Sequence, residues 1–105
     1  MFKGLRLPWF NKDFKNKDLM GDDLSGANLS QCDFTEANLT GAVLVGADLS
    51  QSVFVKANLT AADFTRGDLS LAQFNRANLH GVKLVYARLS KADLSWSDLS
   101  DADLT

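Results

Sequence analysis

A strict five-residue period constrains this chain more than any other feature of its sequence. From Leu19 to Leu104 every fifth residue is leucine or phenylalanine, at 18 positions without an exception. Two residues earlier, from Ala27 to Ala102, the position holds alanine 11 times in 16 and otherwise Ser, Cys, Gly or Val. A large apolar residue and a small residue therefore recur together along most of the chain.

This period fits neither an α-helix nor a straight strand. On a helix five residues advance about 500°, so successive leucines would wind around the cylinder instead of forming one stripe. On a straight strand an odd spacing would place alternate leucines on opposite faces. The remaining solution is a short strand on which the small and the large residue both point inward, followed by a corner. Each five-residue unit is then one side of a polygon.

A superperiod of 20 residues gives the number of sides. Like residues recur at this spacing in three series: Phe14, Phe34, Phe54 and Phe74; Ser30, Ser50, Ser70 and Ser90; Asn38, Asn58 and Asn78. Because stacked coils favour like residues above like, four units should close one coil. The sequence predicts an all-β fold, a right-handed parallel quadrilateral β-helix (a solenoid) of about 4.5 coils and about 22 Å.

The repeated unit also resembles a known family. The segments 27–31 (ANLSQ), 47–51 (ADLSQ) and 57–61 (ANLTA) are similar to the A(D/N)LXX motif of pentapeptide-repeat proteins. The resemblance covers residues 18–105 almost completely. It implies a right-handed quadrilateral β-helix, and it does not imply one function, because the family carries several.

The core follows from the inward positions. One side should carry a ladder of phenylalanines, and other sides should be lined by leucine. The predicted core contains Phe34, Phe54, Phe74, Leu39, Leu59, Leu79, Ala37, Ala57 and Ala77. Cys32 occupies a small inward position, so we expect a buried and inert thiol.

Length and charge divide the chain into two parts. Its 105 residues suit one small domain. Residues 1–17 form a basic, aromatic arm with a net charge of +4, and residues 18–105, the predicted β-helix, carry 6 basic and 12 acidic side chains. No apolar run is long enough to span a bilayer. One cysteine cannot form an internal disulfide and the start lacks the apolar stretch of a signal peptide, so we expect a cytoplasmic protein.

We expect no catalytic, cofactor or metal site. His80 should point to solvent and has no second ligand at metal spacing. The Asp and Asn residues before each central Leu occur singly, which is typical of turns that bond their own backbone. Nucleophile elbows and phosphate-binding loops are missing. The sequence therefore predicts a protein that is not an enzyme and needs no cofactor.

Outward apolar residues are the candidates for a contact surface. They are Val43, Val45, Val53, Val55, Leu71, Tyr86 and Trp96. An alternative is that the β-branched residues simply suit strands. Tyr86 above Arg66 and Trp96 above Arg76 predict two cation–π contacts, or packing between successive coils.

Both ends of a β-helix need cover. Trp9 and Phe10 are the candidates for an N-terminal cap, although the arm also suits an anionic membrane or a partner. The C-terminal end should expose an open β-edge formed by Leu89, Leu94, Leu99 and Leu104. We expect two chains to pair there as a homodimer around a two-fold axis, unless further residues follow in a longer chain.

Two functions of different classes remain. The first is a non-catalytic protein-interaction or scaffolding module whose partner is unknown. The second is implied by the family resemblance: a DNA mimic that binds DNA gyrase or topoisomerase, as in quinolone resistance. A rod of about 22 Å standing in for duplex DNA would need about 13 negative charges, whereas the body carries −6. The acidic body also argues against direct nucleic-acid binding.

Overall fold

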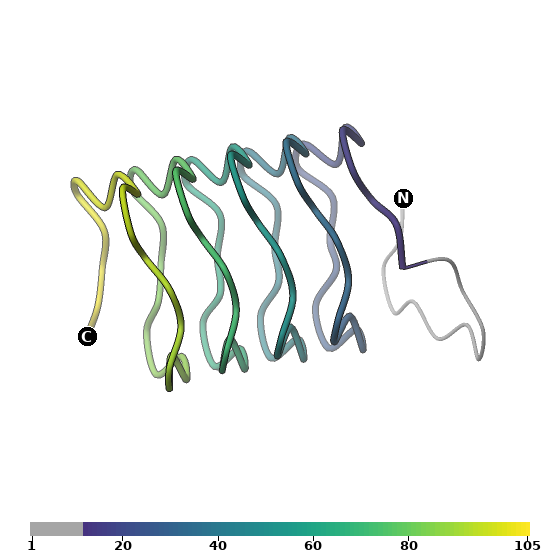
Figure 1. Ribbon diagram of the computed structural model, residues 1–105. Coiled ribbons are helices and arrows are strands. Elements are labelled where there is room, and N and C mark those ends of the chain that lie inside the picture. The colour runs from purple at the N-terminus through teal and green to yellow at the C-terminus, as the bar shows by residue number, and fades with distance from the viewer. Residues whose placement is uncertain (1–11) are drawn as a thin grey trace.

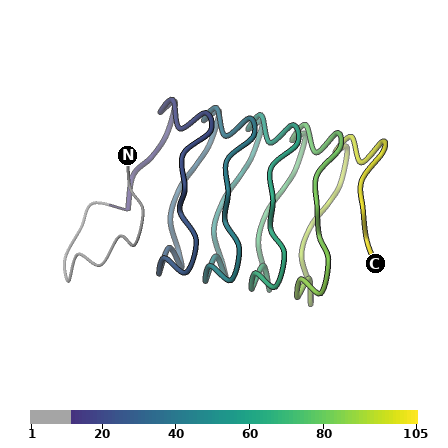
Figure 2. The same cartoon turned by 180° about the vertical axis from the view of Figure 1, so that it is seen from behind.

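The chain winds into a stack of similar coils along one axis. The computed structural model describes residues 12–105, which run from one end of the stack to the other (Figure 1). From behind, the coils follow one another in the same regular order (Figure 2). Residues 12–105 contain no helix, and hence none long and apolar enough to cross a membrane.

Parallel pairing joins residues that are 20 positions apart. The pairs are single-residue bridges, beginning with Asp13 and Asp33 and ending with Lys83 and Asp103. One coil is therefore 20 residues, or four five-residue units. The β-solenoid prediction is confirmed, whereas the right-handed sense stays a prediction.

Backbone hydrogen bonds explain why each unit is one side of the coil. The Leu39 N–H donates to the Asn58 carbonyl of the next coil at 2.7 Å, and the Asn58 N–H donates back to the Ala37 carbonyl at 3.0 Å. At the corner, the Ala42 N–H donates to the Leu39 carbonyl at 2.9 Å and closes a β-turn. The ladder holds coil to coil, and the turn bends the chain towards the next side.

Each corner requires a left-handed residue. Positive φ recurs at every fifth residue from Asn16 to Asp101, at 13 non-glycine residues and five glycines. A non-glycine residue in this region costs roughly 1–2 kcal/mol, and β-branched residues suffer most. Accordingly, no Val, Ile or Thr occupies a corner between Asn16 and Asp101.

The interior is a set of stacked columns. Phe34, Phe54 and Phe74 are almost fully buried, and their successive rings stack with centroids 4.9 Å apart. Phe64 lies edge-on to Phe54 at 6.0 Å. The other predicted core residues are also buried: Leu39, Leu59, Leu79, Ala37, Ala57 and Ala77. The one buried polar residue of the described core, Ser52, donates its hydroxyl to the Leu29 carbonyl at 2.8 Å.

The parallel pairing of the β-helix begins before residue 18, where the sequence places the boundary between the arm and the β-helix. Asp13 bridges Asp33, and the Phe14 N–H donates to the Asp33 carbonyl at 2.7 Å. Lys12 and Lys17 occupy the register positions that hold small inward residues in later coils, although both lysines are exposed, and they hide the repeat of this first coil in the sequence. The structure thus assigns residues 13–17, placed in the arm by composition, to the β-helix.

Candidate interaction surface

Many polar side chains of the repeats form hydrogen bonds within their own repeat. The Asp or Asn before the central residue accepts the backbone N–H two positions later, as Asp33 does from Thr35 at 2.9 Å. The Thr35 hydroxyl donates to the same oxygen at 2.6 Å. The same arrangement joins Asn58 to Thr60. The interpretation of these residues as turn-forming is confirmed, and their hydrogen bonds stabilise the corners.

These hydrogen bonds change the acidity of several carboxyl groups. A donated hydroxyl proton lowers the pKa of Asp68, chiefly through Ser70, and that of Asp98, chiefly through Ser100. The pKa of Asp103 is lowered in the same way, chiefly by the Thr105 hydroxyl. Each carboxylate is therefore a structural acceptor that is stabilised in its charged form.

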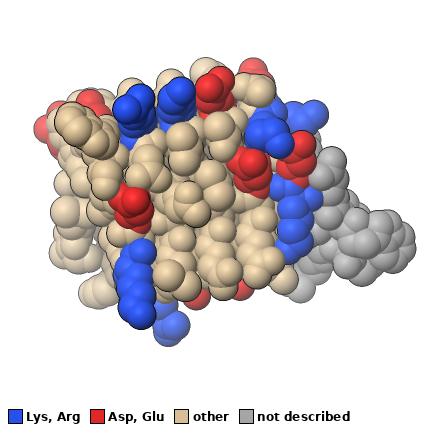
Figure 3. Space-filling view, viewed as in Figure 1, with Lys and Arg blue, Asp and Glu red and all other residues tan. Residues whose placement is uncertain are grey.

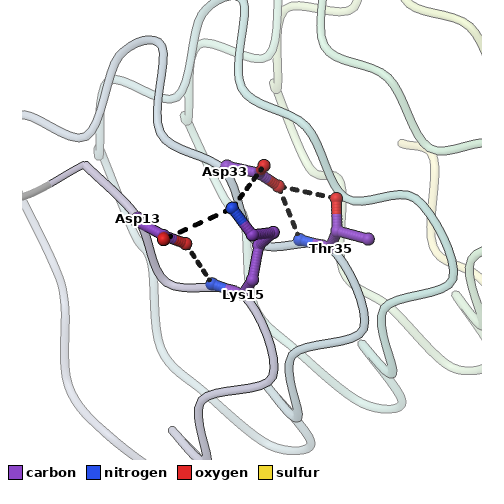
Figure 4. A network of polar contacts seen from close by, with 4 residues as sticks. All are labelled: Asp13, Lys15, Asp33 and Thr35. Carbon is purple, nitrogen blue, oxygen red and sulfur yellow. Dashed lines mark hydrogen bonds and ion pairs between the residues drawn. The ribbon is translucent and has the colours of Figure 1, made fainter.

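An ion-pair network lies on the first coil. The Lys15 ammonium stands 3.3 Å from the Asp13 carboxylate and 3.8 Å from that of Asp33, so that it joins two successive coils (Figure 4). The Lys15 N–H also donates to Asp13, which lowers the pKa of that carboxyl. Sequence reasoning missed this network, because it assigned Asp13 and Lys15 to the arm.

Cys32 lies in the core. It is a free cysteine with 0% exposure, and burial raises the pKa of its thiol to about 11. At neutral pH the side chain is a thiol and not the reactive thiolate. It therefore serves as packing.

His80 belongs to an exposed polar cluster. Its Nδ1 lies 2.8 Å from the Ser100 hydroxyl oxygen, and its Nε2 lies 3.8 Å from the Asp101 carboxylate. The Ser100 hydroxyl donates its single proton to Asp98 at 2.7 Å. The histidine must therefore donate to Ser100 and cannot take its proton, so the cluster does not activate a nucleophile. The described part of the chain also holds no group of three or more His, Cys, Asp or Glu side chains arranged to bind a metal ion.

The predicted apolar contact surface is not one surface. Val43 and Val53 are ten residues apart, which is half of a 20-residue coil, so the pair Val43 and Val45 lies on the opposite side from Val53 and Val55. All four valines are partly buried. Leu71, Tyr86 and Trp96 occupy three different corner columns. The superperiod of the sequence already implied this separation.

One of the two predicted cation–π contacts forms. The Arg66 guanidinium lies over the Tyr86 ring, 5.6 Å from its centroid. Arg76 makes no such contact with Trp96 in the described residues. Trp96 is 86% exposed, Tyr86 70% and Leu71 48%.

One side of the β-helix combines several of these residues. We call it the Val53 face, and it consists of outward strand residues between two corner columns. The strand residues are Asp33, Thr35, Val53, Val55, Gln73, Asn75, Asp93 and Ser95. One border is the corner column of Gln31, Gln51, Leu71 and Lys91, and the other is the corner column of Glu36, Lys56, Arg76 and Trp96. Figure 3 shows one side of the molecule, on which uncharged residues (tan) cover most of the surface between the Lys and Arg residues (blue) and the Asp and Glu residues (red).

The predicted N-terminal cap and the predicted C-terminal edge lie at the two ends of the stack. The candidate cap residues Trp9 and Phe10 lie outside the described residues. At the other end Leu104 is 62% exposed, and Leu89, Leu94 and Leu99 are partly buried. The N–H groups of these four leucines donate to no backbone carbonyl in residues 12–105, which is an open β-edge.

The sequence matches two models of pentapeptide repeats. The model of the pentapeptide repeat region matches residues 8–84, and the model of pentapeptide repeats in eight copies matches residues 84–105. The chain belongs to the pentapeptide-repeat family. No curated protein matches the chain significantly.

The chain is also similar to several solved structures. A pentapeptide-repeat protein of the Arabidopsis thaliana thylakoid lumen is 34% identical over 88% of this chain and 64% of its own, with a TM-score of 0.85. A pentapeptide-repeat protein of the cyanobacterium Cyanothece 51142 is 30% identical over 84% and 64%, with a TM-score of 0.47. QnrB1, a plasmid-mediated fluoroquinolone resistance protein, is 21% identical over 86% and 62%, with a TM-score of 0.44. This chain thus spans less than two thirds of the length of these relatives.

Proposed function

We propose that this pentapeptide-repeat protein is a non-catalytic module that binds another protein along the side of its β-helix. One observation carries the proposal. Leu71, Tyr86 and Trp96 are large, exposed and held at φ of +57 to +62°, where glycine would fit without strain. None of the three is part of the buried core, so their backbone cost is not offset by burial. Contact with a partner protein at these corners would give the side chains a reason to be there.

Site-specific photo-crosslinking tests the proposal in the source cell. A photoreactive residue at Trp96 should give a discrete crosslinked protein band. The same residue at Ala61, another exposed corner with a φ of +59°, is the matched control. Equal and diffuse labelling from both positions would contradict a specific interaction through these corners.

We further propose that two chains pair through their C-terminal coils as a homodimer. The open edge at Leu89, Leu94, Leu99 and Leu104 supports this pairing, because unsatisfied strand groups and exposed leucines favour another β-edge. Additional repeats in a longer chain would satisfy the same edge. Closed two-fold dimers are the commonest oligomers of soluble proteins.

Light scattering after gel filtration tests the dimer. The wild-type chain should show twice its 11.5 kDa mass, and Leu99→Lys should return it to the monomer. Ala61→Lys adds the same charge at a lateral corner, where Lys56 has the same backbone conformation, and should remain dimeric. A wild-type monomer at high concentration would overturn the pairing.

The gyrase-binding alternative receives no support from the charge distribution. Residues 12–105 hold all 13 acidic side chains of the chain together with 9 of its 11 basic ones. Segments 37–41, 57–61 and 77–81, which stack on one side, contain no Asp, Glu, Lys or Arg. A DNA mimic needs a continuous row of negative charge. We expect no effect on gyrase supercoiling at micromolar concentration.

The cytoplasm remains our proposed location. The buried free thiol of Cys32 needs no oxidising compartment. The relative from the thylakoid lumen shows that the same fold also occurs in another compartment. Cell fractionation with an antibody against the untagged protein distinguishes the two locations.

A further inference from the structure

We propose that the C-terminal half of the Val53 face binds an extended acidic segment of a partner protein. This inference rests on the proposed function and names the chemistry of the partner. Its starting point is a set of three cations, Lys56, Arg76 and Lys91, on the two borders of the face. All three are exposed, and none forms an ion pair within the described residues.

The absence of ion pairs here contrasts with the first coil on the same side of the β-helix. There Lys15 is placed between two carboxylates, Asp13 and Asp33, at 3.3 and 3.8 Å. Glu36 stands one coil below Lys56 in the same corner column, yet no ion pair joins the two side chains. The fold therefore pairs a lysine on the first coil and leaves three cations available on the later coils.

Apolar side chains accompany these cations. Trp96 completes the column of Lys56 and Arg76, and Leu71 completes the column of Lys91. Val55 lies between the two borders and is partly buried. A ligand on this half of the face would therefore contact an indole ring and aliphatic groups as well as positive charge, and Trp and Arg are enriched at binding hot spots.

The negative charge on this half is limited to Asp93. Its Oδ1 accepts the Ser95 N–H at 3.0 Å and also the Ser95 hydroxyl, so this carboxylate is engaged within its own strand. Three cations against one hydrogen-bonded carboxylate leave a local positive excess on a protein of net charge −2. A partner with negative charge would be electrostatically complementary to it.

The dimensions favour a short peptide over a nucleic acid. Successive coils are about 4.8 Å apart, so Lys56 to Trp96 covers about 10 Å, which is about three residues of extended peptide. Side chains two residues apart on one face of such a peptide can reach both Lys56 and Arg76. A longer polyanion would continue onto the coil that carries Asp33 and Glu36 and would find only one exposed ring for stacking.

Fluorescence anisotropy with a defined probe tests the inference. The probe is a fluorescein-labelled decapeptide of alternating Glu and Leu, and a peptide with Lys in place of Glu is its control. The wild-type protein should bind the Glu peptide and not the Lys peptide, and affinity should fall with added salt. A labelled ten-nucleotide oligothymidylate measures the competing class of ligand.

Two matched arginine variants locate the site. Arg76→Glu should weaken binding of the Glu peptide about tenfold, because an attractive contact becomes repulsive. Arg66→Glu makes the same charge change at another corner, with φ of +60° against +61°. It removes the contact with the Tyr86 ring, but it lies half a coil away from Arg76 and outside the Val53 face, and should retain wild-type affinity for the Glu peptide. Trp96→Ala should also weaken binding. Glu36 occupies the same corner column, so the backbone accepts glutamate there.

Three outcomes would overturn the inference. The first is an equal loss of affinity for the Glu peptide in both arginine variants, which would indicate general electrostatic attraction. The second is no binding of the Glu peptide at millimolar concentration. The third is that the oligothymidylate binds more tightly than the Glu peptide. The crosslinking experiment separates this failure from failure of the proposed function. A specific crosslink from Trp96 that persists in Arg76→Glu would keep the interaction module and reject the acidic segment.

Discussion

The first and last coils of this β-helix have similar repeats and different surroundings. Leu24 and Leu104 stand in the same column, yet Leu24 is 2% exposed and Leu104 is 62% exposed. The two coils also differ at the register positions that hold small inward residues elsewhere. The first coil has the long, exposed Lys12 and Lys17 there, whereas the last coil has the small, partly buried Ala92, Ser97 and Ala102. Equivalent leucines of one column are therefore buried at one end of the described stack and exposed at the other.

The middle of the stack provides the reference for both ends, and it should show the largest effect. Phe54 is fully buried, with rings stacked on both sides at 4.9 Å. Phe54→Ala should lower the free energy of unfolding by about 3–5 kcal/mol, because a cavity forms between two rings. Urea denaturation measures the loss. An unchanged midpoint would contradict the stacking.

The two leucines of one column test the difference between the ends directly. Leu24→Ala should cost about 2–4 kcal/mol, because a buried side chain is lost. Leu104→Ala should cost less than about 1 kcal/mol, because its side chain is largely in solvent already. Both are measured by denaturation at low protein concentration, where no pairing of chains contributes. Equal costs would mean that the last coil is covered in solution.

Corner residues of one column should give a smaller contrast. Gly21 has a φ of +70° and open space where a Cβ would stand, so Gly21→Ala should cost about 1 kcal/mol through the backbone alone. Asp101 occupies the equivalent corner with a φ of +58°, and Asp101→Gly should stabilise by about 0.5 kcal/mol. Thermal denaturation compares both variants with the wild type. A destabilising Asp101→Gly would show that its carboxylate matters more than its backbone.

Acid should affect the two ends through different partners. The folded state lowers the pKa of Asp13 mainly through the Lys15 N–H and that of Asp98 mainly through the Ser100 hydroxyl. Each contribution is fully present above the unfolded pKa near 4 and is lost as pH falls through the lower folded pKa.

Asparagine variants separate the two mechanisms. Asp98→Asn retains an oxygen acceptor for Ser100, as in the Asn58 unit, and should reduce the loss of stability below pH 4. Asp13→Asn removes the ion pair with Lys15 as well, so its effect at neutral pH should shrink in high salt. Denaturation curves from pH 6 to pH 2 provide the measurement. Identical salt dependence in both variants would contradict this distinction.

Thiol reactivity should report a similar contrast between the interior and the C-terminal end of the stack. Native Cys32 should resist a thiol reagent at pH 8, because it is buried and its pKa is raised to about 11. In a Cys32→Ser background, Ser97→Cys places the thiol at a partly buried inward position of the last coil. It should react at least about tenfold faster, since the end of the stack opens more easily. Similar rates would mean that the last coil opens no more easily than the coil that carries Cys32.

How far sequence reasoning reached depended on the range of the interaction. The columns of Phe34, Phe54 and Phe74 followed from the 20-residue superperiod, because stacking repeats a local pattern. The surface assignment was weaker. Val43 and Val53 were grouped as apolar neighbours, although half a coil separates them, because shared chemistry was given more weight than register.

By itself the sequence determined the period, the inward and outward positions and the family, because each depends on residues close together or on identical units stacked at a fixed spacing. Only the tertiary structure decided that the ladder starts at Asp13, that Lys15 joins two coils and that Leu71, Tyr86 and Trp96 are held at positive φ. The physical reason is closure. Once the coil closes, a side chain lies next to residues that are 20 positions away in the sequence. Its neighbours therefore depend on the turn at every corner and not on the adjacent residues of the chain.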